Sequence, residues 1–253
     1  MRLFFLSIML ISINLVSCQK NAKQVPTAEA MNRNTISFYA KDSVLITADT
    51  YFLKDIPPTV LLCHQAGFSR GEYMNTAKKL NDLGFSCLAI DQRSGKEVNG
   101  IVNQTALDAD SKLKNVGYTG AKQDIDAAID YLYNSNGNKP VIVVGSSYSA
   151  SLALWIATEN SKVKAVAAFS PGEYLTGIDL ADKIRTLHVP AFVTSSKRET
   201  PTVEKLIHDI DPEYVTQFKS TAPGIHGSRA LWETTEGHQA YWEAFKKFML
   251  ANK

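Results

Sequence analysis

The feature that most restricts the fold of this chain is a series of short apolar runs separated by segments of helical periodicity. The runs comprise Thr59–Cys63, Phe85–Ile90, Val141–Val144, Val163–Phe169 and Ala191–Thr194. Short runs without polar alternation are typical of strands that are buried on both faces. The helical segments between them predict the crossover connections that parallel strands require. We therefore expect an α/β fold, a three-layer α/β/α sandwich around a mostly parallel sheet.

Further strands and helices are expected on either side of these runs. Two alternating segments, at 35–39 and 44–52, predict an antiparallel hairpin, and a short strand is expected at 214–218. Helices are expected over 73–83, 121–133, 148–158, 201–210 and 238–250. These elements predict a single folded domain over residues 35–253.

The N-terminus has a different character. Arg2 precedes an uncharged run over residues 3–16, which is shorter than the roughly 20 residues that span a membrane. This pattern predicts a signal peptide over residues 1–17. Residues 15–18, Leu-Val-Ser-Cys, resemble a bacterial lipobox, which implies a lipid on Cys18 and a location in the cell envelope. An uncleaved anchor, or a secretory signal with an incidental cysteine, remains an alternative.

Residues 18–34 predict a flexible tether between the lipid and the domain. The lipid would then be the only contact with a membrane. The chain of 253 residues has a formal net charge of +2, and its lysines and arginines are spread along the sequence. A nucleic-acid partner is therefore not expected. The oligomeric state does not follow from the sequence.

No cofactor and no metal are expected. The sequence has neither His-x-x-x-His nor Cys-x-x-Cys spacing, and no glycine-rich phosphate loop follows the first apolar run. Cys63 and Cys87 each lie inside a strand-like run. An exported protein could oxidise them, but buried strand cysteines are more often small core residues, so we predict free thiols.

A serine with the position of a nucleophile follows the third buried strand. The strand leads into Gly145–Ser149, and a helix follows at once. A serine on such a tight turn projects its hydroxyl above the sheet, next to the free N–H groups of a helix N-terminus. Ser147 is therefore the predicted nucleophile. A simple helix N-cap is the alternative.

A catalytic triad on this fold also needs an acid and then a histidine, in that chain order. His226, in a glycine-flanked loop before the last helix, is the preferred base, with His238 as the alternative. Glu199 is the predicted acid because it follows the penultimate strand. It could instead supply only negative charge at the next helix N-terminus. Glu204 and Asp211 are fallback candidates for the acid.

An oxyanion hole needs two backbone donors. One is expected from Tyr148, the residue after the nucleophile, and the other from the loop after the first buried strand. In that loop Ala66 is the preferred donor, and Gln65 is close behind. His64 is expected to shape the loop rather than to act as a base.

Taken together, the motifs resemble the α/β-hydrolase superfamily, and within it the small dienelactone-hydrolase-like branch. They comprise His64–Gly67, Arg70–Tyr73, Asp91–Ser94, the Ser147 turn and His226–Gly227. The resemblance covers about residues 44–250 and implies an eight-stranded sheet and a triad of Ser147, Glu199 and His226. Three departures stand out: Glu199 replaces the commoner aspartate, Ser149 replaces a glycine, and the nucleophile is serine rather than cysteine.

The expected activity is hydrolysis of a small carboxylic ester through an acyl-enzyme on Ser147. Only about 20 residues separate the strand at 163 from the next one, too few for a separate lid domain. Arg93 and Tyr118 are expected to border an open cleft. A thioesterase, a peptidase or an envelope glycan deacetylase with the same triad is an alternative, as is an inactive hydrolase fold that only binds.

Overall fold

The computed structural model describes residues 33–54 and 58–253. The predicted signal peptide, the lipidation site Cys18 and almost all of the tether lie outside the described residues. Within the described ranges, no helix has the length and apolar character needed to cross a membrane.

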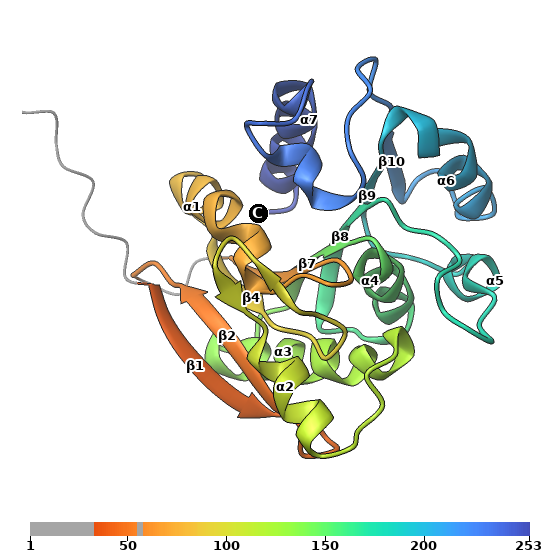
Figure 1. The fold of residues 1–253 in the computed structure, drawn as a ribbon. Coiled ribbons are helices and arrows are strands. Elements are labelled where there is room, and N and C mark those ends of the chain that lie inside the picture. Colours follow the sequence, from red (N-terminus) through yellow and green to blue (C-terminus); the bar gives the residue numbers. More distant parts are fainter. Residues whose placement is uncertain (1–32, 55–57) are drawn as a thin grey trace, which may run out of the picture. The chain divides into compact units, whose positions relative to one another are not determined.

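One sheet of eight strands organises the fold, in the order β1-β2-β4-β3-β7-β8-β9-β10 (Figure 1). The strands are β1 Arg33–Tyr39, β2 Leu45–Tyr51, β3 Thr59–Cys63, β4 Ser86–Ile90, β7 Val141–Ser146, β8 Val163–Phe169, β9 Ala191–Thr194 and β10 Val215–Phe218. β2 pairs antiparallel with β1 and β4, and all other neighbours are parallel. The predicted hairpin and mostly parallel eight-stranded sheet are confirmed.

Helices cover both faces of the sheet. They are α1 Met74–Asp82, α2 Gln104–Ser111, α3 Lys122–Ser135, α4 Tyr148–Glu159, α5 Leu180–Ile184, α6 Thr200–Leu206 and α7 His238–Ala251. Leu80 of α1 and Phe245 of α7 pack into the core on one face, whereas Ile129 of α3 and Leu152 of α4 pack into the core on the other. The three-layer sandwich is therefore confirmed.

The apolar runs of the sequence have a direct cause in this layering. Along β3, Val60 and Leu62 enter one core while Leu61 and Cys63 enter the other, and all four are fully buried. A strand with two buried faces favours apolar side chains on both of them. Cys63 and Cys87 belong to opposite cores, so the sheet separates the two thiols, which are free as predicted. Burial raises the pKa of both thiols.

The segment between β4 and α3 is more ordered than the sequence suggested. It contains α2 and a hairpin of β5 Glu97–Val98 with β6 Ile101–Val102. The expectation that Arg93 borders a cleft is wrong, because its side chain is fully buried. Its Nη2 lies 2.6 Å from Asp124 Oδ1, and its Nη1 lies 2.7 Å from Asp42 Oδ2. Between β8 and β9 the described chain forms only α5, and no lid domain is inserted there.

Candidate active site

Ser147 occupies a strained turn between β7 and α4. Its backbone has φ 61° and ψ −123°, a conformation that costs a non-glycine residue of order 1–3 kcal/mol. The Ser147 N–H donates to the Phe169 carbonyl at 2.8 Å and so fixes the turn against β8. A Cβ on Gly145 would lie 2.5 Å from the Ser149 carbonyl oxygen, so only glycine fits there. This is the strand-to-helix turn that exposes a serine hydroxyl above a sheet.

Ser149 takes over a bonding role at the position where the resemblance expects glycine. Its Oγ accepts a hydrogen bond from the Ser146 N–H at 2.8 Å and donates to the Cys63 carbonyl at 2.7 Å. The hydroxyl therefore closes the turn and joins it to β3. The departure from the family pattern is compatible with the nucleophile's geometry.

Glu199 and His226 are brought together from two loops that follow β9 and β10. His226 Nδ1 lies 2.5 Å from Glu199 Oε1. Glu199 Oε2 accepts from Ser196 Oγ at 2.7 Å and from Ser170 Oγ at 2.9 Å. Glu199 and Ser196 also form a capping box at the 3-10 turn that precedes α6. Helix capping and pairing with the histidine are therefore compatible roles.

The charge on Glu199 is strongly favoured. Burial raises the pKa of this carboxyl, but hydrogen bonds from His226 and Ser196 outweigh burial and lower the pKa to about 2. An ionised carboxylate here holds the proton of His226 on Nδ1. The other ring nitrogen, Nε2, is then the one that can accept a proton.

A change of Glu199 to glutamine should reduce the pH dependence of stability in acid. Because the folded pKa of about 2 lies below the usual 4.5, the ionised group stabilises the fold above about pH 4.5. That stabilisation is lost as the pH falls towards 2, and we expect about 1–3 kcal/mol after allowing for partial exposure. Urea unfolding at pH 7 and pH 3 measures it. A Glu199→Gln deficit that is equal at both pH values would contradict the lowered pKa.

The alternative base and acids have other partners. His238 Nδ1 lies 3.0 Å from the Thr235 carbonyl at the start of α7. Glu204 forms an ion pair with Lys219, and Asp211 accepts from the Glu213 N–H. None of these three contacts Glu199 or His226 in the described structure, so the geometry favours the preferred pair.

The loop after β3 contains the two candidates for the second oxyanion donor, Gln65 and Ala66. The Gln65 N–H donates to Glu72 Oε2 at 2.8 Å, and the Gly67 N–H donates to the Ser94 carbonyl at 3.3 Å. The Ala66 N–H between them has no hydrogen-bond partner among the described residues. Tyr148 is the first residue of α4, so its N–H has no acceptor within the helix. Of the two candidates for the second donor, only Ala66 therefore has a backbone N–H that is free to donate.

His64 uses both ring nitrogens to shape this loop. Its Nδ1 lies 2.8 Å from the Gln65 carbonyl, and its Nε2 accepts from the Gln92 N–H at 2.8 Å. Burial lowers the pKa of His64 to about 4, so the ring is neutral near pH 7. This matches its expected structural role.

Sequence reasoning missed a buried carboxylate that links the three loops. Glu72 Oε1 accepts from Ser146 Oγ at 2.8 Å and from Ser228 Oγ at 2.6 Å, and Oε2 accepts from the Gln65 N–H. It thereby joins the loop of the oxyanion donor, the turn of Ser147 and the loop of His226. Burial raises the pKa of Glu72. The sequence offered Glu72 only as part of a family-like motif.

Ser170 is a second missed residue, directly after β8. Its Oγ donates to Glu199 and accepts from the Gly227 N–H at 3.0 Å. It therefore couples the acid to the loop of the base. Within the described residues, no hydrogen bond yet joins Ser147 to His226; such catalytic contacts often tighten only when substrate binds.

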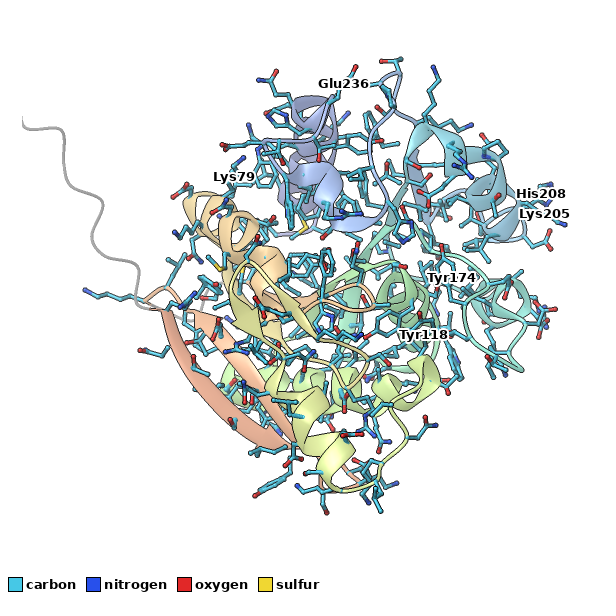
Figure 2. All side chains as sticks on the ribbon, in the orientation of Figure 1. Lys79, Tyr118, Tyr174, Lys205, His208 and Glu236 are labelled. Carbon is cyan, nitrogen blue, oxygen red and sulfur yellow. The ribbon has the colours of Figure 1, made fainter. Side chains whose placement is uncertain are left out.

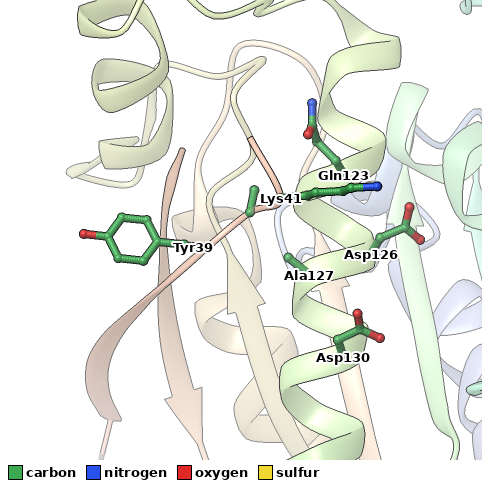
Figure 3. Close-up of a pocket in the computed structure, with 7 residues that line it drawn as sticks. Tyr39, Lys41, Gln123, Asp126, Ala127 and Asp130 are labelled. Atoms are coloured by element: carbon green, nitrogen blue, oxygen red, sulfur yellow. The ribbon is translucent and has the colours of Figure 1, made fainter. Parts of the chain in front are cut away.

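A surface pocket away from the proposed triad has no serine, cysteine or histidine in its lining. It lies between the end of β1 and α3 (Figure 3), and its lining includes Asp126 and Asp130. Lys122 and Lys162 pair with these two carboxylates. Across the part of the chain that the structure describes, no three His, Cys, Asp or Glu side chains are grouped to hold a metal ion.

A mostly parallel sheet, a strained serine after β7 and a His–Glu pair after the last strands define an α/β-hydrolase. The family described as "Serine aminopeptidase, S33" matches residues 55–211, and the chain belongs to this family. The predicted resemblance to α/β-hydrolases and the prediction of a hydrolase enzyme are thus confirmed. No curated protein in the comparison matches the sequence significantly.

Several solved structures share the fold. An esterase from Pyrococcus furiosus is 17% identical, with 87% of this chain and 93% of that chain covered and a TM-score of 0.69. A dienelactone hydrolase from Anabaena variabilis is 16% identical, with 87% and 97% covered and a TM-score of 0.65. The α/β-hydrolase GrgF from Penicillium is 10% identical, with 87% and 98% covered and a TM-score of 0.67.

Proposed function

We propose that the protein is a serine esterase that hydrolyses a carboxylic ester of a small molecule through an acyl-enzyme on Ser147. The observation that carries the proposal is the 2.5 Å contact between His226 Nδ1 and Glu199 Oε1, on loops at the same sheet edge as the strained serine. A histidine oriented by a carboxylate is the partner that converts a weak serine nucleophile into an active one.

The chemistry would run in two halves. Ser147 Oγ attacks the ester carbonyl while His226 Nε2 takes its proton, and the N–H groups of Tyr148 and Ala66 bind the oxyanion. His226 then returns the proton to the leaving alcohol, and Ser147 carries the acyl group. In the second half, water attacks the acyl-enzyme with His226 again as base. The free acid leaves, and Ser147 regains its proton.

An ester fits the site better than a peptide with a free amino terminus. An aminopeptidase needs an acidic group for the substrate ammonium, but three carboxylates on the strand-end loops, Glu72, Glu173 and Glu199, already have partners. Both oxygens of Glu72 and of Glu199 accept hydrogen bonds from the protein. Glu173 accepts from the N–H groups of Leu180 and Ala181. The names of the similar structures, an esterase and a dienelactone hydrolase, also favour an ester.

Steady-state and burst kinetics test this proposal. We expect p-nitrophenyl acetate to give a burst of p-nitrophenol in proportion to enzyme, because an acyl-enzyme accumulates. Its kcat/KM should exceed that of an aminoacyl p-nitroanilide by at least about 100-fold, or 2.7 kcal/mol. A thioester and an acetylated sugar extend the comparison to the alternative substrates. Faster cleavage of the anilide would contradict an esterase, and inactivity on all substrates would favour a binding protein.

We also propose that Cys18 is lipidated and that the enzyme is held in the bacterial cell envelope. The proposal is supported by the lipobox-like residues 15–18 at the end of the uncharged run that begins at residue 3. Intact mass spectrometry of the membrane-extracted protein tests it. A mature chain that begins at Cys18 and carries diacylglyceryl is expected, and an unmodified cysteine would contradict lipidation.

A further inference from the structure

Two aromatic side chains with exposed surface flank the proposed reaction centre, and the proposed mechanism uses neither. Tyr118 stands at the start of the 3-10 turn Tyr118–Ala121, before α3. Its ring stacks on Tyr148, with centroids 4.6 Å apart and planes 18° apart. Tyr148 is fully buried and its hydroxyl accepts from Gln92 Nε2 at 3.1 Å, whereas Tyr118 is 38% exposed. The inner ring of the stack is thus fixed, and the outer ring meets solvent.

Tyr174, in the loop after β8, contacts the proposed base. Its ring meets His226 edge-on, with centroids 6.4 Å apart and planes 77° apart. Its hydroxyl donates to the Ser170 carbonyl at 3.3 Å, which fixes the ring. Burial raises the pKa of Tyr174, and Glu199 and Tyr118 raise it further, so Tyr118 lies within electrostatic range. Figure 2 shows the labelled Tyr118 and Tyr174 in the same region of the molecule.

The two rings have different relations to the scissile bond. Tyr118 lies on the side chain of Tyr148, the residue directly after the nucleophile, where its ring can meet the acyl group. Tyr174 lies on His226, which would protonate the leaving alcohol, so Tyr174 is on the alcohol side. A flat ring that enters the acyl side could extend the existing stack of two tyrosines. Offset stacking of this kind contributes about 0.5–1.5 kcal/mol beyond the burial of area.

We propose that Tyr118 is a specificity residue and that the substrate is an ester whose acyl group carries a planar aromatic ring. This inference rests on the proposed esterase function and assigns its substrate class. The acyl ring stacks on Tyr118, and the alcohol passes Tyr174. An aromatic ring fits this arrangement because its face stacks without a hydrogen bond, and the hydroxyls of Tyr148 and Tyr174 are already engaged.

Matched esters and matched variants test this substrate class. We expect the wild type to prefer ethyl 3-phenylpropanoate over ethyl 3-cyclohexylpropanoate. The change Tyr118→Leu should lower kcat/KM about 10-fold on the phenyl ester relative to ethyl acetate, and Tyr118→Phe should retain the preference. Tyr131→Leu is the control, because Tyr131 stacks on Phe38 at 4.8 Å in a pair outside the proposed site. It should leave the ratio of the two esters unchanged.

The outcomes separate this inference from the proposed function. If the wild type hydrolyses ethyl acetate but Tyr118→Leu changes all esters equally, the aromatic inference fails and the esterase stands. Equal rates on the phenyl and cyclohexyl esters would also overturn it. If no ester is hydrolysed, calorimetry on Ser147→Ala with ethyl 3-phenylpropanoate still measures ring binding. If the double variant Ser147→Ala/Tyr118→Leu then binds this ester with the same Kd as Ser147→Ala, the inference is overturned independently.

Discussion

Replacement of Ser147 by alanine is expected to lower kcat on p-nitrophenyl acetate by about 10⁴- to 10⁶-fold, while the protein stays folded. Alanine keeps the Cβ of the strained turn and the N–H bond to Phe169, so it removes only the attacking oxygen. Initial rates and circular dichroism measure the two effects. Ser161→Ala, at an exposed position after α4, is the control and should retain full activity.

A double variant tests whether Ser147 and His226 act as one unit. The serine needs the histidine as its base, and the histidine acts only through the serine. The double variant Ser147→Ala/His226→Ala should therefore lose no more activity than either single variant. Losses that multiply would mean that the two residues act separately. Full activity in Ser147→Ala would exclude this residue as the nucleophile.

The largest stability effect is expected from Arg93→Met. The Arg93 side chain is fully buried between Asp124 and Asp42, and Asp124 is fully buried as well. Removal of the cation leaves a buried carboxylate without its partner, which costs about 3–5 kcal/mol of the free energy of unfolding. Urea denaturation measures it. Burial already raises the pKa of Asp124 against the opposing effect of Arg93, so the variant should bind a proton at a higher pH.

An exposed ion pair provides the matched control for this change. Arg185 pairs with Asp182 at 2.9 Å, and both side chains are more than half exposed. Arg185→Met should therefore lower the free energy of unfolding by less than about 1 kcal/mol. If Arg93→Met and Arg185→Met lowered the free energy of unfolding equally, the argument from burial would be contradicted.

The central strands β3, β4, β7, β8 and β9 were predictable because both faces of each are buried, which leaves a continuous apolar run in the sequence. α2 escaped prediction for the opposite reason. Of its residues only Thr105 and Ala109 are buried, and its N-cap, Asn103, gives only a local signal. A helix with so little apolar surface has no periodicity to detect. The short hairpin of β5 and β6 likewise has no buried run.

The parts of the proposed site that were predictable are the residues whose roles depend on which strand they follow. Ser147, Glu199 and His226 follow from the order of strand ends, and the short Glu199–His226 contact is consistent with that order. Glu72 could not be predicted, because its burial depends on Ser228, which lies 156 residues away in the sequence. Arg93 was misplaced for the same reason. Its partner Asp124 is 31 residues distant, and sequence patterns do not show that the two meet in the interior.

Labelling with a fluorophosphonate, followed by peptide mass spectrometry, tests the central claim most directly. An activated serine reacts with this reagent and an ordinary serine does not. We predict one adduct, on the peptide that contains Ser147, and a strong loss of labelling in His226→Ala and in Glu199→Gln. A folded protein with no adduct, or with the adduct on another serine, would contradict the assignment of Ser147 as the nucleophile.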